Sequence, residues 1–161
     1  MKDQLLIAAD VAERYRDAML AGLTAEQWTQ QPPDLPMHPA SIVGHVAAVY
    51  GFVAGMMEGK APALPQGWPQ SMAHSAQCQP DTAYPPKDEL LSVLKCARGR
   101  VIEALRKATP EDLARPIEHP RLKAIFPTVG ALAISSLTVH DATHNGQLSS
   151  WRRAMGMELP I

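Results

Sequence analysis

A long helical pattern near the C-terminal end, from Val129 to Met155, carries two histidines four residues apart, His140 and His144. In an α-helix, residues i and i+4 lie one above the other with Cβ atoms about 5–6 Å apart. Bonds of about 2.0–2.1 Å from imidazole nitrogen to zinc let such a pair reach a single cation. Steps of three and four residues from His140 trace one apolar stripe: Val129, Ala133, Leu137, His140, His144, Leu148, Trp151 and Met155. The two histidines therefore belong to a core-facing surface and are a candidate metal clip.

A third histidine, His45, lies on the apolar face of a second predicted helix, which opens at Pro39 with His38 near the cap position. A single histidine on such a face is usually a hydrogen-bonded core residue. Three are harder to explain in that way, because each buried imidazole needs partners for its polar nitrogens. A shared cation would satisfy one nitrogen of each ring. His45, His140 and His144 then give three ligands and an open position, which is the pattern of a catalytic metal site.

The acidic residues argue for one metal ion rather than two. Di-iron helical bundles need carboxylates that project inward from several helices. Here Glu58, Glu89 and Glu103 fall off the apolar faces. Neutral imidazoles suit zinc, nickel, copper or iron, and affinity order alone does not select among them. We expect zinc or nickel, and no organic cofactor.

Four further side chains are candidates for supporting roles. Gln147, three residues after His144, either contacts a metal ligand or the substrate, or makes an ordinary polar contact. The same two alternatives hold for Ser41, one turn before His45. His74 and His119 lie in long connections and either approach the site, as a fourth ligand or acid/base, or face solvent. Cys78 has no neighbour that would activate its thiol. No catalytic residue is assigned from the sequence.

Length and charge limit the class of protein. A chain of 161 residues is expected to be a single domain, residues 1–161. Aromatic residues make up only 5%, while Ala, Leu and Met supply most of the apolar volume, which favours helices. The formal net charge is −1 without a long run of either sign, so neither nucleic acid nor a membrane surface is expected as a partner.

Three observations favour a cytoplasmic location. The N-terminus carries acidic residues too early for a secretory signal. The longest uncharged apolar run, Ile42 to Met57, contains His45 and is shorter than the roughly 18–20 residues that span a bilayer. Cys78 and Cys96 are too far apart in the sequence for a Cys-x-x-Cys motif and too few for a disulfide framework.

Periodicity and proline positions predict an all-α fold. A first helix covers about Asp3 to Leu23, and Thr24 to Gln27 has the form of a capping box before a short turn ending near Trp28. A third long helix follows Pro86 and stops before Thr109, and a fourth is capped by Thr128. The four long helices would form a four-helix bundle, with long connections between the second and third (60–86) and the third and fourth (115–127).

The second helix carries small residues beside its apolar stripe, at Gly44, Ala48, Gly51, Gly55 and Gly59. Glycine inside a helix costs about 0.5–1 kcal/mol relative to alanine. So many glycines suggest that a backbone approaches closely, either from a neighbouring helix or from a second subunit. A purely structural homodimer built on this stripe is therefore a third hypothesis beside an enzyme and a binding protein.

Several short motifs in fixed order resemble the DinB/YfiT-like superfamily of metal-binding four-helix bundles. They are Leu23-Thr-Ala-Glu-Gln-Trp28, Ser41-Ile-Val-Gly-His45, His140-x-x-x-His144-x-Gly-Gln147 and Met155-Gly-Met-Glu-Leu-Pro160. The resemblance covers nearly the whole chain. It implies that His45, His140 and His144 are the metal triad.

The resemblance also implies a broad class of activity. Members of that superfamily include metal-dependent hydrolases and transferases that join a low-molecular-weight thiol to an electrophile. The family often has arginine after the last histidine, whereas this chain has Asn145. We therefore expect a small-molecule substrate, with a hydrolase or thiol S-transferase as the first hypothesis and a non-catalytic metal-binding or small-ligand-binding bundle as the second.

Overall fold

The computed structural model describes residues 2–60, 68 and 84–160. All of its regular elements are helices, with no strand among those residues. The predicted all-α fold is therefore confirmed for the described part of the chain. The elements are α1 (Lys2–Leu20), α2 (Ala25–Thr29), α3 (Pro39–Glu58), α5 (Lys87–Lys107), α6 (Pro110–Ala114), α7 (Val129–Ser135), the π-helix η2 (Ser136–His140) and α8 (Asp141–Ala154).

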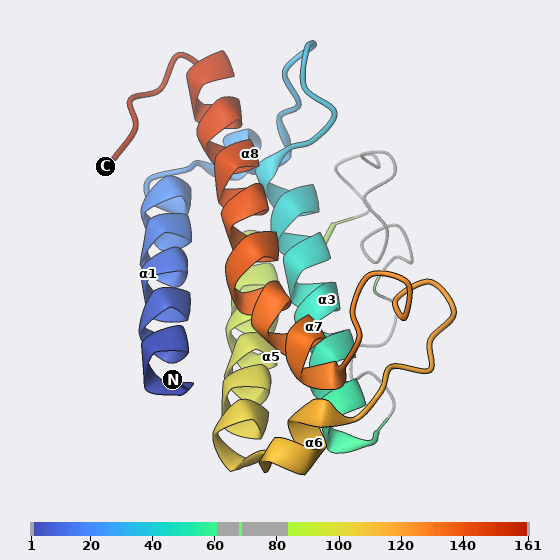
Figure 1. The fold of residues 1–161 in the computed structure, drawn as a ribbon. Coiled ribbons are helices and arrows are strands. Elements are labelled where there is room, and N and C mark those ends of the chain that lie inside the picture. Colours follow the sequence, from blue (N-terminus) through green and yellow to red (C-terminus); the bar gives the residue numbers. More distant parts are fainter. Residues whose placement is uncertain (1, 61–67, 69–83, 161) are drawn as a thin grey trace.

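The long helices pack side by side with mixed directions (Figure 1). α1 and α8 run one way and α3 and α5 run the other way, so α3 and α5 are parallel neighbours with the most extensive packing in the molecule. Hydrogen bonds join α1 and α5 near their ends: Lys87 of α5 donates to the carbonyl of Leu23, just after α1, at 2.8 Å, and Lys2 of α1 donates to the carbonyl of Ala108, just after α5. A parallel pair requires a long connection, as predicted for residues 60–86, most of which lies outside the described residues.

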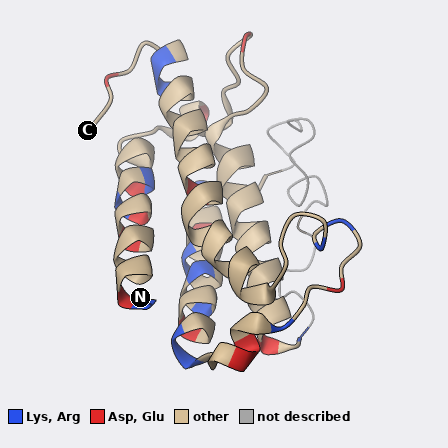
Figure 2. Ribbon diagram, in the orientation of Figure 1, with Lys and Arg blue, Asp and Glu red and all other residues tan. Residues whose placement is uncertain are grey.

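α3 is the central helix of the core. Its only charged residue is Glu58, at the last position, and the rest of its ribbon is uncharged (Figure 2). Most of its residues are buried. By length and hydropathy α3 would be able to cross a membrane, but 78% of its most apolar stretch is buried inside the protein. The glycines at 44, 51 and 55 are also buried within the single chain, which accords with close approach by a neighbouring helix. Burial in the core therefore explains the apolar sequence of α3.

The predicted helix starts are confirmed by their caps. Thr24 and Gln27 form the expected capping box at α2. At α3, Pro39 is the first residue and His38 is the N-cap; its ring accepts from the Ser41 amide at 3.2 Å, and Ser41 Oγ accepts from the His38 amide at 3.1 Å. Thr128 caps α7 by accepting from the Ala131 amide. These side chains satisfy backbone donors that have no partner within the helix.

The first helix is shorter than predicted. It ends at Leu20 rather than Leu23, because Gly22 adopts a left-handed conformation with φ of +73° and turns the chain towards α2. Leu23 keeps its apolar role, since it is buried in the core beside that turn. The error arises because the apolar spacing continues past the point where the backbone leaves the helix.

The last helix was predicted as one continuous α-helix, and this prediction is wrong in one respect. A π-helical segment, η2, interrupts it between α7 and α8. Hydroxyls donate to backbone carbonyls around the interruption, from Ser136 to Ala133, from Thr138 to Ile134 and from Thr143 to Val139, at 2.8, 2.8 and 2.9 Å. Such bonds satisfy carbonyls whose normal helical partners are displaced. The predicted stripe itself is confirmed, since all eight of its residues are buried or half-buried.

Gly130, in the first turn of α7, marks the closest packing against α6. A β-carbon at this position would lie 2.8 Å from the Leu113 carbonyl oxygen and 2.9 Å from the Leu113 β-carbon. We predict that Gly130→Ala lowers the free energy of unfolding by about 1–3 kcal/mol, the usual cost of overpacking. Denaturant unfolding followed by circular dichroism would measure the change.

Gly99, on the exposed face of α5, is the matched control. No atom lies within 4 Å of the position that its β-carbon would take. Gly99→Ala should leave the stability unchanged or raise it by up to about 1 kcal/mol, because alanine is the better helix former. Equal effects of the two substitutions would contradict the proposed contact between α6 and α7.

Candidate metal centre

Three histidine rings from two parts of the chain converge at one point. Nε2 of His140 lies 3.1 Å from Nε2 of His45 and 3.1 Å from Nε2 of His144. The three ring centroids are 4.4–5.1 Å apart, and one nitrogen from each ring lies within 4.8 Å of the others. His45 comes from α3, His140 is the last residue of η2, and His144 is in the first turns of α8. Residues 95 positions apart in the sequence therefore meet here.

The contacts within the cluster are not explained by hydrogen bonds between the rings alone. A neutral imidazole has one N–H and one acceptor nitrogen. Nε2 of His140 faces two other ring nitrogens at the same distance, and a single proton lies along only one of those directions. A cation equidistant from the three nitrogens would bind all of them through their lone pairs. With zinc–nitrogen bonds of about 2.0–2.1 Å, one cation needs nitrogens about 3.0–3.4 Å apart. Two of the three nitrogen pairs have this separation, and the third pair lies within 4.8 Å. The donor set therefore fits a single transition-metal ion.

Burial keeps the rings in the neutral form that binds metal. His144 is 5% exposed and His140 is half-buried. Burial, with a smaller contribution from the neighbouring rings of His144 and His45, lowers the pKa of His140 to about 3. Burial also lowers the pKa of His144. Both side chains are therefore uncharged at neutral pH, and no proton has to be displaced before a metal binds.

Gln147 orients one of the three ligands. Its Oε1 lies 2.7 Å from Nδ1 of His144, one helical turn before it. An amide oxygen only accepts, so Nδ1 of His144 donates the proton and the lone pair is left on Nε2. Nε2 is the atom that faces the other two histidines. Gln147 thus selects the ring tautomer that a metal requires.

The other candidate residues have different places in the structure. Ser41 belongs to the α3 cap, one turn before His45. His119 packs edge-on against Phe52, with ring centroids 5.9 Å apart, and is not part of the histidine cluster. His74 and Cys78 lie outside the described residues. Cys96 is exposed as a free cysteine on α5.

The acidic residues set aside from the sequence are also away from the cluster. Glu58 pairs with Arg100 at 2.9 Å, and Glu103 pairs with Lys107 at 3.2 Å on the surface. Asn145, where the superfamily often has arginine, is buried and donates to the Ala12 carbonyl at 2.9 Å. It therefore attaches α8 to α1, which is a structural contact that carries no charge.

The sequence analysis missed one buried group beside the cluster. Asp141 follows His140 directly, is 1% exposed, and forms an ion pair with Arg16 of α1 at 3.1 Å. The two residues are 125 positions apart. The signal that was available is the position of Asp141 next to the apolar stripe, on a side of the helix where a charge needs a partner.

These observations define a class of protein, an all-helical protein in which helices from two parts of the chain hold three convergent histidines. Comparison with known families gives a more specific assignment. The sequence profile of the DinB superfamily matches residues 9–148, and the chain belongs to this superfamily. No curated protein shows significant similarity to the chain. The family resemblance found in the sequence is thus confirmed.

The histidine cluster makes a direct prediction about metal content. Wild-type protein refolded with zinc or nickel and then dialysed should retain one metal ion per chain, and His140→Ala should retain almost none. Nε2 of His140 lies 3.1 Å from Nε2 of each of the other two rings, so loss of His140 should weaken binding by more than the roughly 10–100-fold that is typical for an outer partner. Elemental analysis by mass spectrometry would measure the content.

His119→Ala is the matched control, because it removes a histidine that packs on Phe52 outside the cluster. It should retain the metal content of the wild type. Wild-type protein that holds no more metal than His140→Ala would disprove the metal centre.

The contact between Gln147 and His144 predicts a smaller effect. Gln147→Leu keeps the approximate size but removes the acceptor, so the affinity for metal should fall by about 10–100-fold while the helix content stays unchanged. Competition with a chromophoric chelator would give the dissociation constant. Ser150→Ala is the control, because its exposed hydroxyl bonds only to the Gly146 carbonyl, one turn before it. An equal loss in both variants would exclude a specific role for Gln147.

Proposed function

We propose that the protein is a metal-dependent enzyme of the DinB superfamily, a single domain of residues 1–161 with the four-helix bundle and long connections typical of that fold. Three histidines, His45, His140 and His144, would hold one divalent ion, zinc or nickel, without an organic cofactor. The observation that supports this proposal is the convergence of three Nε2 atoms from two separate helical regions. The substrate would be a small molecule.

The chemistry follows from the kind of ligand set. When bound, a divalent cation lowers the pKa of a coordinated water or thiol, so that hydroxide or thiolate is available near neutral pH. Three protein ligands leave a position for that group. The chain itself supplies neutral imidazoles, a fixed tautomer at His144 through Gln147, and a partly apolar environment from α3 and α8. Both hydrolysis and S-transfer use these features.

A two-part assay tests the proposal and separates the two reactions. Metal-loaded protein is incubated with an activated ester, and separately with a panel of low-molecular-weight thiols and a model electrophile. In S-transfer a carbon–sulfur bond forms and the leaving group departs; in hydrolysis water takes the place of the thiol. We expect turnover in one arm for the wild type and none for His140→Ala. Turnover that requires thiol indicates a transferase, and turnover without thiol indicates a hydrolase.

A non-catalytic metal-binding or small-ligand-binding protein is the alternative, and one observation favours it. Asp141, the carboxylate next to His140 in the chain, is bound to Arg16 and is therefore not available as a general base. Among the described residues, the cluster contains histidines only. Metal binding that depends on His140, combined with no turnover in either arm of the assay, would support this alternative over the enzyme.

The remaining expectations concern partners and location. We propose a cytoplasmic protein that binds neither nucleic acid nor membranes, which the net charge of −1 and the burial of α3 support. A homodimer remains part of the proposal. Gly44, Gly51 and Gly55 of the glycine stripe are buried within the single chain, so the interface would use another surface. Light scattering would report the mass in solution.

A further inference from the structure

An ion pair lies in the protein interior directly behind the histidine cluster. Nη1 of Arg16 donates to both carboxylate oxygens of Asp141, at 3.2 and 3.1 Å. The two side chains are 2% and 1% exposed. Asp141 is the residue after His140 and the first residue of α8, so this pair connects α1 to the point where the π-helix η2 ends.

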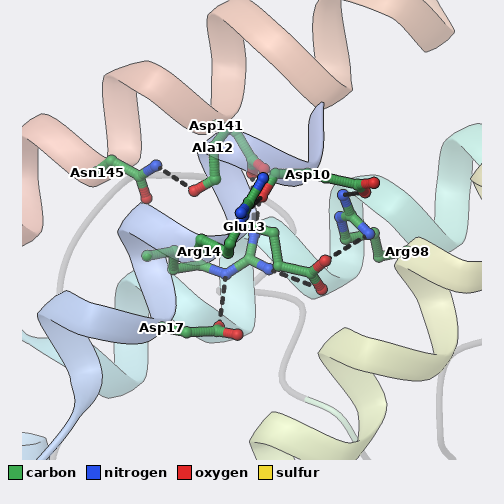
Figure 3. A network of polar contacts seen from close by, with 9 residues as sticks. Asp10, Ala12, Glu13, Arg14, Asp17, Arg98, Asp141 and Asn145 are labelled. Atoms are coloured by element: carbon green, nitrogen blue, oxygen red, sulfur yellow. Dashed lines mark hydrogen bonds and ion pairs between the residues drawn. The ribbon is translucent and has the colours of Figure 1, made fainter. Parts of the chain in front are cut away.

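The ion pair belongs to a larger network that reaches three helices (Figure 3). Glu13, on the same helix as Arg16, lies 3.7 Å from Arg16 and 2.8 Å from Arg98 of α5. Tyr50 of α3 is fully buried beside the pair. Its burial, and then the charge of Asp141, raise the pKa of its hydroxyl. The helix that carries Tyr50 also carries His45. Asp141 therefore lies beside α1, which carries Arg16, and beside α3, which carries both Tyr50 and His45.

The π-helix makes this position important for the geometry of the histidines. A π-turn closes hydrogen bonds over five residues instead of four, so it rotates the helix after it relative to the helix before it. His140 is the last residue of that turn and His144 follows it. The direction of both rings towards His45 therefore depends on the rotation. π-turns are rare and need support from the surrounding structure. The ion pair of Asp141 acts at the first residue after the turn.

We propose that Asp141 is a positioning residue for the metal centre: its ion pair with Arg16 sets the rotation of the helix so that His140 and His144 face His45. This inference rests on the metal site proposed above and adds a residue outside the ligand set. A buried ion pair contributes little net stability, because desolvation offsets the attraction. Removal of one partner alone leaves an unpaired buried charge and lowers stability, so the positioning role has to be measured in the geometry of the metal site.

Two single variants test the proposal. Asp141→Asn keeps the shape but removes the charge, and Arg16→Met removes the guanidinium while keeping a long side chain. We expect each to weaken metal binding by about 10–100-fold, as for other groups that orient ligands. With cobalt as a spectroscopic substitute for zinc, the absorption bands in the visible range should also change, because they report the arrangement of the ligands. A loss of stability alone would not change them in the folded, metal-loaded protein.

Arg152 supplies a matched control. It is another buried arginine that joins α8 to α1, and its Nη1 donates to the Met19 carbonyl at 2.9 Å. It lies two turns beyond His144, at the far end of α8. Arg152→Met should lower the melting temperature, as Arg16→Met should, but leave the affinity for metal and the cobalt spectrum unchanged. Equal loss of affinity in the two arginine variants would overturn the proposal.

A double variant keeps the test valid if a single variant fails to fold. Arg16→Met with Asp141→Leu removes both charges and leaves no unpaired charge in the interior, so it should fold. Weakened metal binding of about the same size as in the single variants supports the proposal, and wild-type binding overturns it. The metal centre is tested separately: if the wild type binds no metal, the proposed function fails, whereas wild-type binding that is matched by Asp141→Asn refutes only the positioning role.

Discussion

The arrangement of the functional region depends on the rotation of the last helix about its own axis. His140 and His144 must present the same ring nitrogen, Nε2, to a histidine on α3 that is 95 residues away in the sequence. The apolar stripe holds α7, η2 and α8 against the core and sets this rotation only approximately, because apolar contacts are not directional. Directional contacts refine it. They are the hydrogen bond from His144 to Gln147 and the ion pair of Asp141 with Arg16.

The burial of α3 provides the other half of the arrangement. A helix with one charged residue in twenty is surrounded by neighbours on most sides, and α5 is the neighbour with the most extensive packing against it. His45 is thus carried by the least mobile kind of element, a core helix whose first turn is fixed by the His38 and Ser41 cap. The packing of α3 in the core fixes the part of the backbone that carries His45. The ligands on the last helix, which follow a π-turn, need the additional support.

Local patterns predicted most of the fold, and the reason is physical. Capping side chains and prolines act within four residues of a helix start, so Thr24, His38 and Thr128 identify the starts of α2, α3 and α7 from sequence alone. Periodicity placed the three histidines on apolar faces, and the family resemblance joined them into one site. The directions of the helices and the contact between α3 and α5 required the structure.

Two features were not predictable from local patterns. The π-turn spans five residues, Ser136–His140, and its apolar residues fit an α-helical stripe equally well. The pairing of Arg16 with Asp141 joins positions 125 residues apart. Asp141 is the only Asp, Glu, Lys or Arg between Lys123 and Arg152, but the sequence does not show which residue is its partner. Gln147 lies between these cases. Its spacing from His144 made the contact conceivable, but a glutamine three residues after a histidine is also common on an exposed helix surface.

The charge balance of the region bears on its chemistry. His140 and His144 are neutral at neutral pH because burial lowers their pKa values, and the charge of Asp141 is matched by Arg16. A divalent ion held by three neutral imidazoles would thus keep its full charge in a partly desolvated environment, where an uncompensated charge is costly. An anion at the open position reduces that cost. With a metal bound, the ligand set would therefore favour the deprotonated form of a water or thiol over the neutral form, which is the property that both of the proposed reactions, hydrolysis and S-transfer, would require.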